Sequence, residues 1–166
     1  MKWLGILCLF CTCAGLGIVT ARQMRTRLAH MRRLSALLED FSIHIRYQCL
    51  PLEDLLALFA VHPNYQSFTF LRNVSEEFCT GIPPHVLWRD AVSADSAVPP
   101  QAVQTLCALG NVLGTTDMAG QLSAIAMHRR ELEGLAEELD AAYEKKGTLC
   151  RRLGVLTGAM LAILLL

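Results

Sequence analysis

The sequence contains little charge, and a long segment near each end contains none. Charged residues make up 18% of the chain and hydrophobic residues 53%, which is apolar for a soluble protein. The segments Trp3–Ala21 and Leu153–Leu166 have no charged side chain. The formal net charge is zero, so charge gives no indication of a nucleic-acid partner.

Motifs for catalysis and metal binding are also missing. Lys145-Lys146-Gly147-Thr148 has the residue types of a phosphate-binding loop in the wrong order, and Gly-x-Ser-x-Gly and His-Glu-x-x-His do not occur. The five histidines show no ligand spacing, and Cys79 with His85 would supply only two ligands. We therefore expect no enzyme activity, no cofactor and no metal site.

The cysteines do not form a secreted pattern. There are seven, an odd number, and Cys8, Cys11 and Cys13 fall inside the first apolar segment. A secreted disulfide framework would use an even set in a compact chain. Reduced, mostly buried thiols in a cytosolic domain fit the spacing better.

The first apolar segment has the length of a membrane-spanning helix. Trp3–Ala21 spans roughly 28 Å as a helix, close to the bilayer core of about 30 Å, and Trp3 suits the headgroup level. A cleaved signal peptide is the alternative, because Lys2 and Val19-Thr20-Ala21 fit its pattern. The arginines that follow between residues 22 and 33 favour a retained anchor with a cytoplasmic flank.

The second apolar segment is shorter. Leu153–Leu166 gives roughly 21 Å of helix, and Gly154 with Gly158 presents a small-residue face for helix contact. A terminal helix buried in protein or lying in the interface is the alternative. We predict a transmembrane helix over 1–21, a cytoplasmic all-helical domain over 22–152 and a membrane-associated or transmembrane segment over 153–166. The predicted anchor flanks are Trp3, Arg22, Arg25, Lys145, Lys146, Arg151 and Arg152.

Helical spacing dominates the residues between the two ends. Apolar residues recur at three and four positions from Met24 to Ile45 and from Met118 to Tyr143, which predicts two long helices. The first should end near Cys49, with Pro51 in the first turn of the next helix. Shorter helices are expected at about 52–60, 66–79, 84–93 and 101–113, between proline- and glycine-containing breaks. The predicted fold class is all-α: an N-terminal transmembrane helix, a cytoplasmic helical bundle on a long antiparallel helix pair, and a short C-terminal apolar helix.

The long helices should pair antiparallel, because both are predicted to leave the membrane on the same side. In the expected register Glu39 faces Arg130 and Asp40 faces Arg129. Such exposed pairs contribute about 0–1 kcal/mol each, so they select the register more than they stabilise the fold. The other expected encounters are Arg32 and Arg33 with Glu137 and Glu138, and Arg27 with Glu144.

Residues 51–115, called the 51–115 lobe below, are acidic. They hold six carboxylates, including Asp95, against Arg72 and Arg89. A basic cytosolic partner would be attracted to such a surface, and an ordinary solvated surface is the alternative interpretation. The candidate partner-binding residues are Glu53, Asp54, Glu76, Glu77 and Asp90.

Two local features of the chain have structural interpretations. Gly114 is expected to end one helix in the left-handed conformation, and Thr115 or Thr116 to cap the next, with Asp117 placing a negative charge at its positive end. Trp88 is expected to anchor the core from the helix after Pro84.

Three short motifs follow one another in a fixed order. They are Ile45-x-Tyr47-x-x-x-Pro51-Leu52, Trp88-Arg89-Asp90-Ala91 and Leu113-Gly114-x-x-Asp117-x-x-x-Gln121. Together with the apolar ends, they resemble the stage III sporulation protein AB family over essentially the whole chain. That family usually carries acidic residues around Ser42 and His44, where this chain has Glu39 and Asp40 slightly earlier. The motif residues, below the motif set, are Tyr47, Pro51, Leu52, Trp88, Leu113, Gly114, Asp117 and Gln121.

The resemblance implies a non-enzymatic platform or scaffold in a channel-like secretion complex between mother cell and forespore. It implies a place in the mother-cell membrane around the forespore, with the main domain cytoplasmic and similar to the platform proteins of type II secretion and type IV pilus machines. The implied partners are a stage III sporulation protein AA-type ATPase, the other membrane components of that complex and membrane lipid, with no nucleic acid. A membrane-tethered regulatory adaptor is the alternative; an enzyme at the lipid surface and a secreted domain are further hypotheses.

Overall fold

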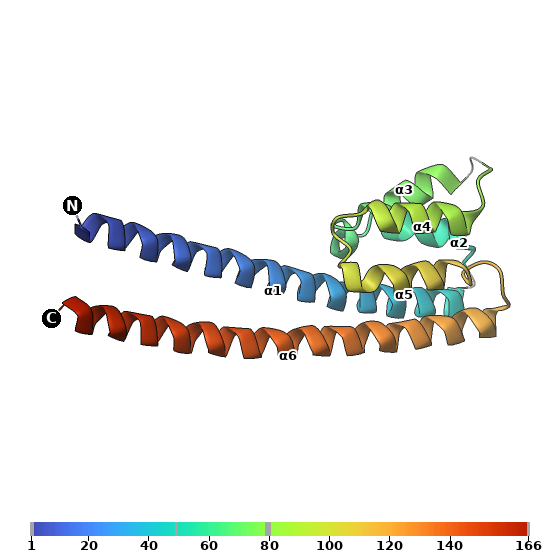
Figure 1. The fold of residues 1–166 in the computed structure, drawn as a ribbon. Helices are drawn as coiled ribbons and strands as arrows, with labels where there is room; N and C mark the ends of the chain where they lie inside the picture. The colour runs from blue at the N-terminus through green and yellow to red at the C-terminus, as the bar shows by residue number, and fades with distance from the viewer. Residues whose placement is uncertain (1, 49, 79–80, 166) are drawn as a thin grey trace. The chain divides into compact units, whose positions relative to one another are not determined.

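The computed structural model describes the backbone of residues 2–48, 50–78 and 81–165, and the side chains of residues 22–48, 50–78 and 81–145. The described residues form helices and no strand, so the predicted all-α class is confirmed. The elements are α1 (Lys2–Gln48), α2 (Leu52–Ala60), the 3-10 helix η1 (Pro63–Tyr65), α3 (Thr69–Glu77), α4 (Pro84–Ala94), α5 (Pro100–Gly110) and α6 (Met118–Leu165), shown in Figure 1.

The predicted helices are found, with two changes of boundary. α3 begins at Thr69, later than expected, because His62-Pro63-Asn64 opens the short helix η1 and the buried Phe68 occupies the cap position of α3. α5 ends at Gly110, earlier than expected, and its last turn passes into consecutive turns. The other helices agree with the sequence prediction within one or two residues.

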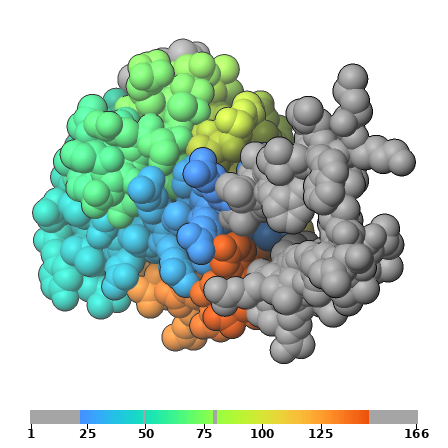
Figure 2. Space-filling view, turned by 90° about the vertical axis from the view of Figure 1, so that its left-hand side faces the viewer, coloured from blue at the N-terminus to red at the C-terminus, as the bar shows by residue number. Residues whose placement is uncertain are grey.

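The chain divides into two compact units, Met1–Leu28 with Glu137–Leu166, and Ala29–Ala136. Within the unit 29–136, α6 lies at one edge and α3 at the other (Figure 1). In the space-filling view the cyan and green residues of α2, η1 and α3 lie side by side on its surface (Figure 2). The unit 29–136 contains the whole 51–115 lobe.

Two polar contacts fix the antiparallel pairing of α1 and α6 inside this unit. Ser35 Oγ donates to Glu133 Oε1 at 3.2 Å, and Arg129 forms an ion pair with Glu39 at 3.3 Å. Glu39 therefore faces Arg129 rather than Arg130, one residue from the expected register. Asp40, expected to face Arg129, instead accepts a hydrogen bond from the hydroxyl of Tyr65.

The core of the unit 29–136 is built from the apolar face of α1 and the inner faces of the short helices. Leu34, Leu37, Leu38 and Phe41 of α1 are fully buried. Edge-to-face and tilted ring contacts connect the helices across this core. These contacts are Phe41 with Phe59 at 4.9 Å between ring centroids, Phe59 with Tyr65 at 5.7 Å, and Phe70 with Trp88 at 5.3 Å.

A buried carboxylate holds the start of α3. Asp95 is 7% exposed, and its Oδ2 accepts from the backbone N–H of Phe70 at 2.9 Å while Oδ1 accepts from Ala97 N–H at 2.9 Å. The carbonyl of Ala97 in turn accepts from His30 Nδ1 at 2.6 Å, which ties this loop to α1. Asp95 was counted with the acids of the 51–115 lobe, but it satisfies backbone groups and adds nothing to the exposed surface.

Within the described residues, no helix has a stretch long and apolar enough to cross a membrane. The predicted anchors over 1–21 and 153–166, with Trp3, Lys146, Arg151 and Arg152, lie outside the described side chains.

The hydroxyl of Tyr65 gives the fold a sensitivity to alkaline pH. Burial raises the pKa of Tyr65 well above its ordinary value, and the hydrogen bond to Asp40 and the charges of Asp40 and Glu39 raise it further. In the unfolded chain the phenol ionises at a pKa of about 10. The resulting stability is fully present below about pH 10 and is lost as the pH rises toward the folded pKa.

We predict that the free energy of unfolding falls above about pH 10 more steeply for the full chain than for Tyr65→Phe. Phenylalanine keeps the ring contacts and cannot ionise, so other titrating groups affect both proteins equally. Urea unfolding of the two proteins in the same detergent, followed from about pH 8 to pH 11, measures the difference. Parallel pH curves would contradict the role given to the Tyr65 hydroxyl.

We also predict opposite effects for two glycine-to-alanine substitutions. A Cβ at Gly110 would overlap Cδ1 of Trp88, whose ring is held by donation from Nε1 to the carbonyl of Leu106 at 2.7 Å. Gly110→Ala should therefore lower the free energy of unfolding by about 1–3 kcal/mol. Gly134 lies inside α6 with no atom within 4 Å of an added Cβ, so Gly134→Ala should raise it by up to about 1 kcal/mol.

Thermal and urea unfolding of the two glycine variants beside the unchanged chain provides the measurement. Equal effects of the two substitutions would contradict the close packing of α5 against Trp88.

Candidate functional site

A solvent-facing pocket of about 180 Å³ lies where α1 ends, α2 begins and α6 begins. Four members of the motif set, Pro51, Leu52, Gly114 and Gln121, contribute to its wall. The pocket is lined by Ile45, Leu50, Pro51, Leu52, Leu55, Gly114, Met118 and Gln121. We take this pocket, called the motif pocket below, as the candidate functional site.

Pro51 sets the direction of the chain at one side of the pocket. It occupies the N-cap of α2 with φ −61° and ψ 153°, just before the first turn in which it was expected. Extended backbone at this position separates α1 from α2, and the ring fixes φ. The carbonyl of Pro51 accepts from Leu55 N–H at 3.1 Å, which starts α2.

Gly114 shapes the opposite side of the pocket. Its φ of 76° confirms the left-handed conformation expected from the sequence. A Cβ at this position would lie 3.2 Å from Cδ2 of Leu52, so the turn packs closely on the start of α2. An L-residue here would meet backbone strain as well as this contact.

Asp117 is the cap of α6, and the threonines before it are not. Asp117 Oδ1 accepts from the backbone N–H of Gly120 at 3.0 Å. The hydroxyl of Thr115 instead donates back to the carbonyls of Asn111 and Val112, and that of Thr116 to Val112. The prediction that Thr115 or Thr116 caps α6 is therefore wrong, and Asp117 has that role in addition to its favourable charge.

Gln121 supplies the polar group of the motif pocket. Its Nε2 donates to the carbonyl of Thr116 at 2.9 Å, which holds the amide across the first turn of α6. With Nε2 used in this way, Oε1 is the amide atom left to accept a hydrogen bond from a ligand. The described lining of the pocket has no titratable side chain.

The remaining motif residues have other places in the structure. Trp88 and Leu113 are each 3% exposed and belong to the core, as expected for Trp88. They border a closely packed depression of about 10 Å³ that also touches Leu52. Tyr47 is 76% exposed near the end of α1 and is absent from the pocket lining.

Sequence reasoning missed part of the motif pocket. Ile45, Leu50 and Leu55 were not predicted to be site residues, although Ile45 opens the first motif. Met118 was expected on the apolar face of α6, whereas its side chain is 44% exposed. The available signal was the position of Met118 directly after the cap residue Asp117, where the first turn of a helix has no preceding turn to cover it.

The five candidate partner-binding acids are all exposed. Glu53 and Asp54 lie in the first turn of α2, directly after the pocket residue Leu52. The two arginines of the 51–115 lobe each pair with a neighbouring acid: Arg72 with Glu76 at 3.7 Å, and Arg89 with Asp90 at 3.2 Å. The exposed surface of the lobe therefore remains negative.

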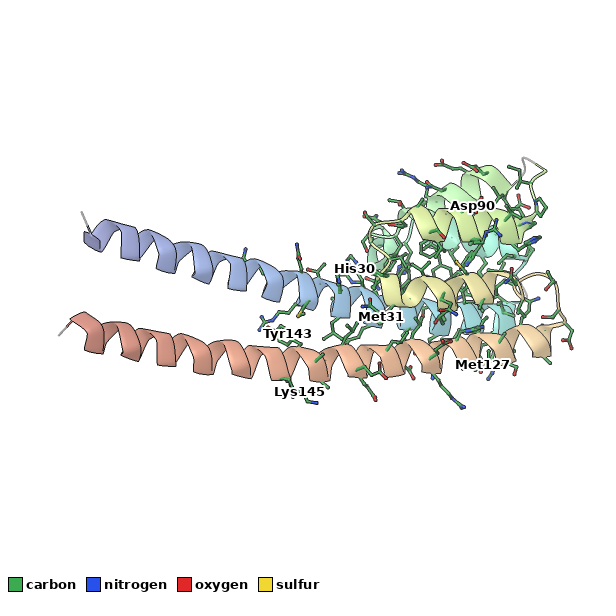
Figure 3. The ribbon with its side chains drawn as sticks, viewed as in Figure 1. His30, Met31, Asp90, Met127, Tyr143 and Lys145 are labelled. Carbon is green, nitrogen blue, oxygen red and sulfur yellow. The ribbon has the colours of Figure 1, made fainter. Side chains whose placement is uncertain are left out.

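Three of the predicted anchor flanks fall within the described side chains. Arg22 and Lys145 are exposed. Arg25 donates from Nε to the hydroxyl of Tyr143 at 2.7 Å, and its guanidinium lies 5.4 Å from the centre of that ring (Tyr143 is labelled in Figure 3). Arg25 thus joins α1 to α6 within the unit formed by residues 1–28 and 137–166.

The described part of the chain brings together no group of three or more His, Cys, Asp or Glu side chains that would hold a metal ion. Cys107, the one cysteine with a described side chain, is a half-buried free thiol. The side chains of the other six cysteines are not among those described. A contact between Cys79 and His85 therefore also lies outside the described residues.

The protein-family model for stage III sporulation protein AB matches residues 2–166. The chain belongs to the stage III sporulation protein AB family. It is therefore a protein of stage III of sporulation, and its family is not known as an enzyme family. No curated protein and no solved structure matches the chain. The resemblance inferred from the ordered motifs is confirmed. Four residues of the motif set line the motif pocket.

Proposed function

We propose that this member of the stage III sporulation protein AB family is a non-enzymatic membrane platform. It docks a stage III sporulation protein AA-type ATPase on the 51–115 lobe and couples that ATPase to the other membrane components of a secretion-like sporulation complex. The observation that carries the proposal is the exposed acidic surface of the lobe. Its five carboxylates are exposed, and its two arginines each pair with a neighbouring acid.

The charge of the lobe suits a basic cytosolic partner. Complementary surface charge raises the association rate and excludes partners of the same sign. Exposed charges contribute little affinity each, so such a surface selects and orients a partner, and apolar contacts must supply the rest.

The lobe contacts α1 through side chains that would transmit a force between them. Tyr65 bonds to Asp40, His30 bonds to Ala97, and the ring of Phe59 packs on Phe41. A partner that pulls on the lobe therefore acts on α1 through several side chains at once. α1 and α6 each continue as one helix into the predicted anchors, so the platform needs no active site to transmit movement.

Membrane attachment is part of the proposal. The apolar segments 1–21 and 153–166 would anchor the chain in the mother-cell membrane around the forespore, with residues 22–152 in the cytoplasm. The basic flanks, including the exposed Arg22 and Lys145, would lie against anionic lipid headgroups.

We predict that the full chain, in nanodiscs of anionic lipid, binds the purified ATPase with an affinity that falls as salt rises. Neutralising the lobe should weaken binding at least about tenfold, because several contacts of about 0.2–1 kcal/mol are lost together. Biolayer interferometry at two salt concentrations measures this. The neutralised variant changes each lobe acid to its amide: Glu53, Asp54, Glu76, Glu77 and Asp90.

The control is Glu137→Gln with Glu138→Gln, two adjacent exposed acids of α6 outside the lobe. Their loss should leave the affinity within about twofold, because neither residue belongs to the lobe and an exposed charge outside a contact contributes little. Absence of binding by the unchanged chain, or an equal loss in the control, would refute docking on the lobe.

A further inference from the structure

We propose that the motif pocket binds a single apolar side chain carried by a basic segment of the partner. This inference rests on the proposed function and places the central contact of the ATPase where the 51–115 lobe joins the end of α1 and the start of α6. It rests on the lining of the pocket, on the amide of Gln121 and on the acids that neighbour the lining residues in sequence.

The pocket has the size and lining for one apolar side chain. Its volume is about 180 Å³, and apart from Gly114 and the amide of Gln121 its wall consists of aliphatic and proline side chains with Met118. An apolar cavity of roughly 150 Å³ is large enough to hold a benzene-sized group. A leucine, methionine or phenylalanine side chain therefore fits, and filling the pocket removes its apolar wall from water.

The wall of the pocket is partly fixed and partly adaptable. Gly114 and Pro51 hold the backbone on two sides, since one requires a left-handed φ and the other has φ fixed by its ring. Met118 is 44% exposed and has three rotatable bonds, so it can close over an inserted side chain. An anchor side chain thus meets a preformed cavity and one flexible edge.

Gln121 adds a directional contact. Because Nε2 is held by the carbonyl of Thr116, Oε1 is available to accept from a donor of the incoming segment. A backbone N–H beside the anchor, or the head of a lysine or arginine, provides such a donor. A purely apolar ligand would leave this acceptor unsatisfied, which favours a peptide over a lipid chain.

The charged residues that neighbour the pocket lining in sequence are mostly acidic. Glu53 and Asp54 follow Leu52, and Asp117 precedes Met118, and all three are exposed. Arg46, which follows Ile45, is the one exposed base beside a described lining residue. The complementary segment therefore carries lysine or arginine on both sides of its apolar anchor.

The first arm of the test is photo-crosslinking with the full chain in nanodiscs and the purified ATPase. The crosslinker p-benzoylphenylalanine replaces Met118 at the pocket or, as the matched control, Met127, which is 60% exposed farther along α6 (Figure 3). We expect a crosslink from position 118 and none from position 127. Mass spectrometry should place it in a segment of the ATPase that contains an apolar residue flanked by lysine or arginine.

The second arm compares two variants that each neutralise one acid of the lobe. Asp54→Asn removes a charge next in sequence to the lining residue Leu55, whereas Asp90→Asn removes one from α4 that pairs with Arg89. We expect Asp54→Asn to weaken ATPase binding about fivefold at low salt and Asp90→Asn less than about twofold.

The outcomes separate the two proposals. If the ATPase binds but crosslinks equally from both positions, or both variants act alike, the motif pocket is not the contact and the proposed function stands. A crosslink from position 118 to a second copy of this chain would likewise overturn the inference. Failure of the unchanged chain to bind the ATPase overturns both proposals.

Discussion

The structure of residues 29–136 depends on the antiparallel return of α6 along α1. Both helices give this pairing a buried apolar face, and Ser35 with Glu133 and Glu39 with Arg129 fix its register. Because α1 ends at Gln48 and α6 begins at Met118, the pairing brings the two ends of the 51–115 lobe together. The motif pocket lies at that junction, so a shift in register would move Gln121 away from Leu52.

The carboxylates of the lobe differ in burial, and the sequence does not show which of them is buried. Asp95 is buried and accepts from the backbone N–H of Phe70 at the start of α3 and from that of Ala97, whereas Glu53 and Asp54 are exposed in the first turn of α2. The buried group contributes to a rigid lobe, and the exposed groups give that lobe its charge. An acidic surface beside an apolar pocket suits a docking site, because the pocket can provide affinity and the charges can provide selectivity.

Helix positions and breaks could be predicted, because apolar spacing, Pro51, Pro84 and Pro100 act through neighbouring residues. Local chemistry also predicted the conformation of Gly114. The prediction failed where a distant contact decides the outcome: Asp40 bonds to Tyr65 rather than to α6, and Asp95 caps a helix far back in the sequence. The pocket combines residues from both sides of the lobe, and no spacing rule gives their distance. Asp117 displaced the expected threonine caps because the two threonine hydroxyls donate back to carbonyls of the preceding turn.

In the proposed function, the 51–115 lobe is a cytoplasmic surface of a chain anchored at residues 1–21 and 153–166. Reporter fusions after residues 60 and 150 in sporulating cells test this claim most directly. One reporter should be active only in the cytoplasm and the other only outside the membrane. The proposed function predicts that the cytoplasmic reporter is active at both positions, because both fall between the predicted anchors. An external signal at either position would contradict it, since a cytosolic ATPase would then have no access to the lobe.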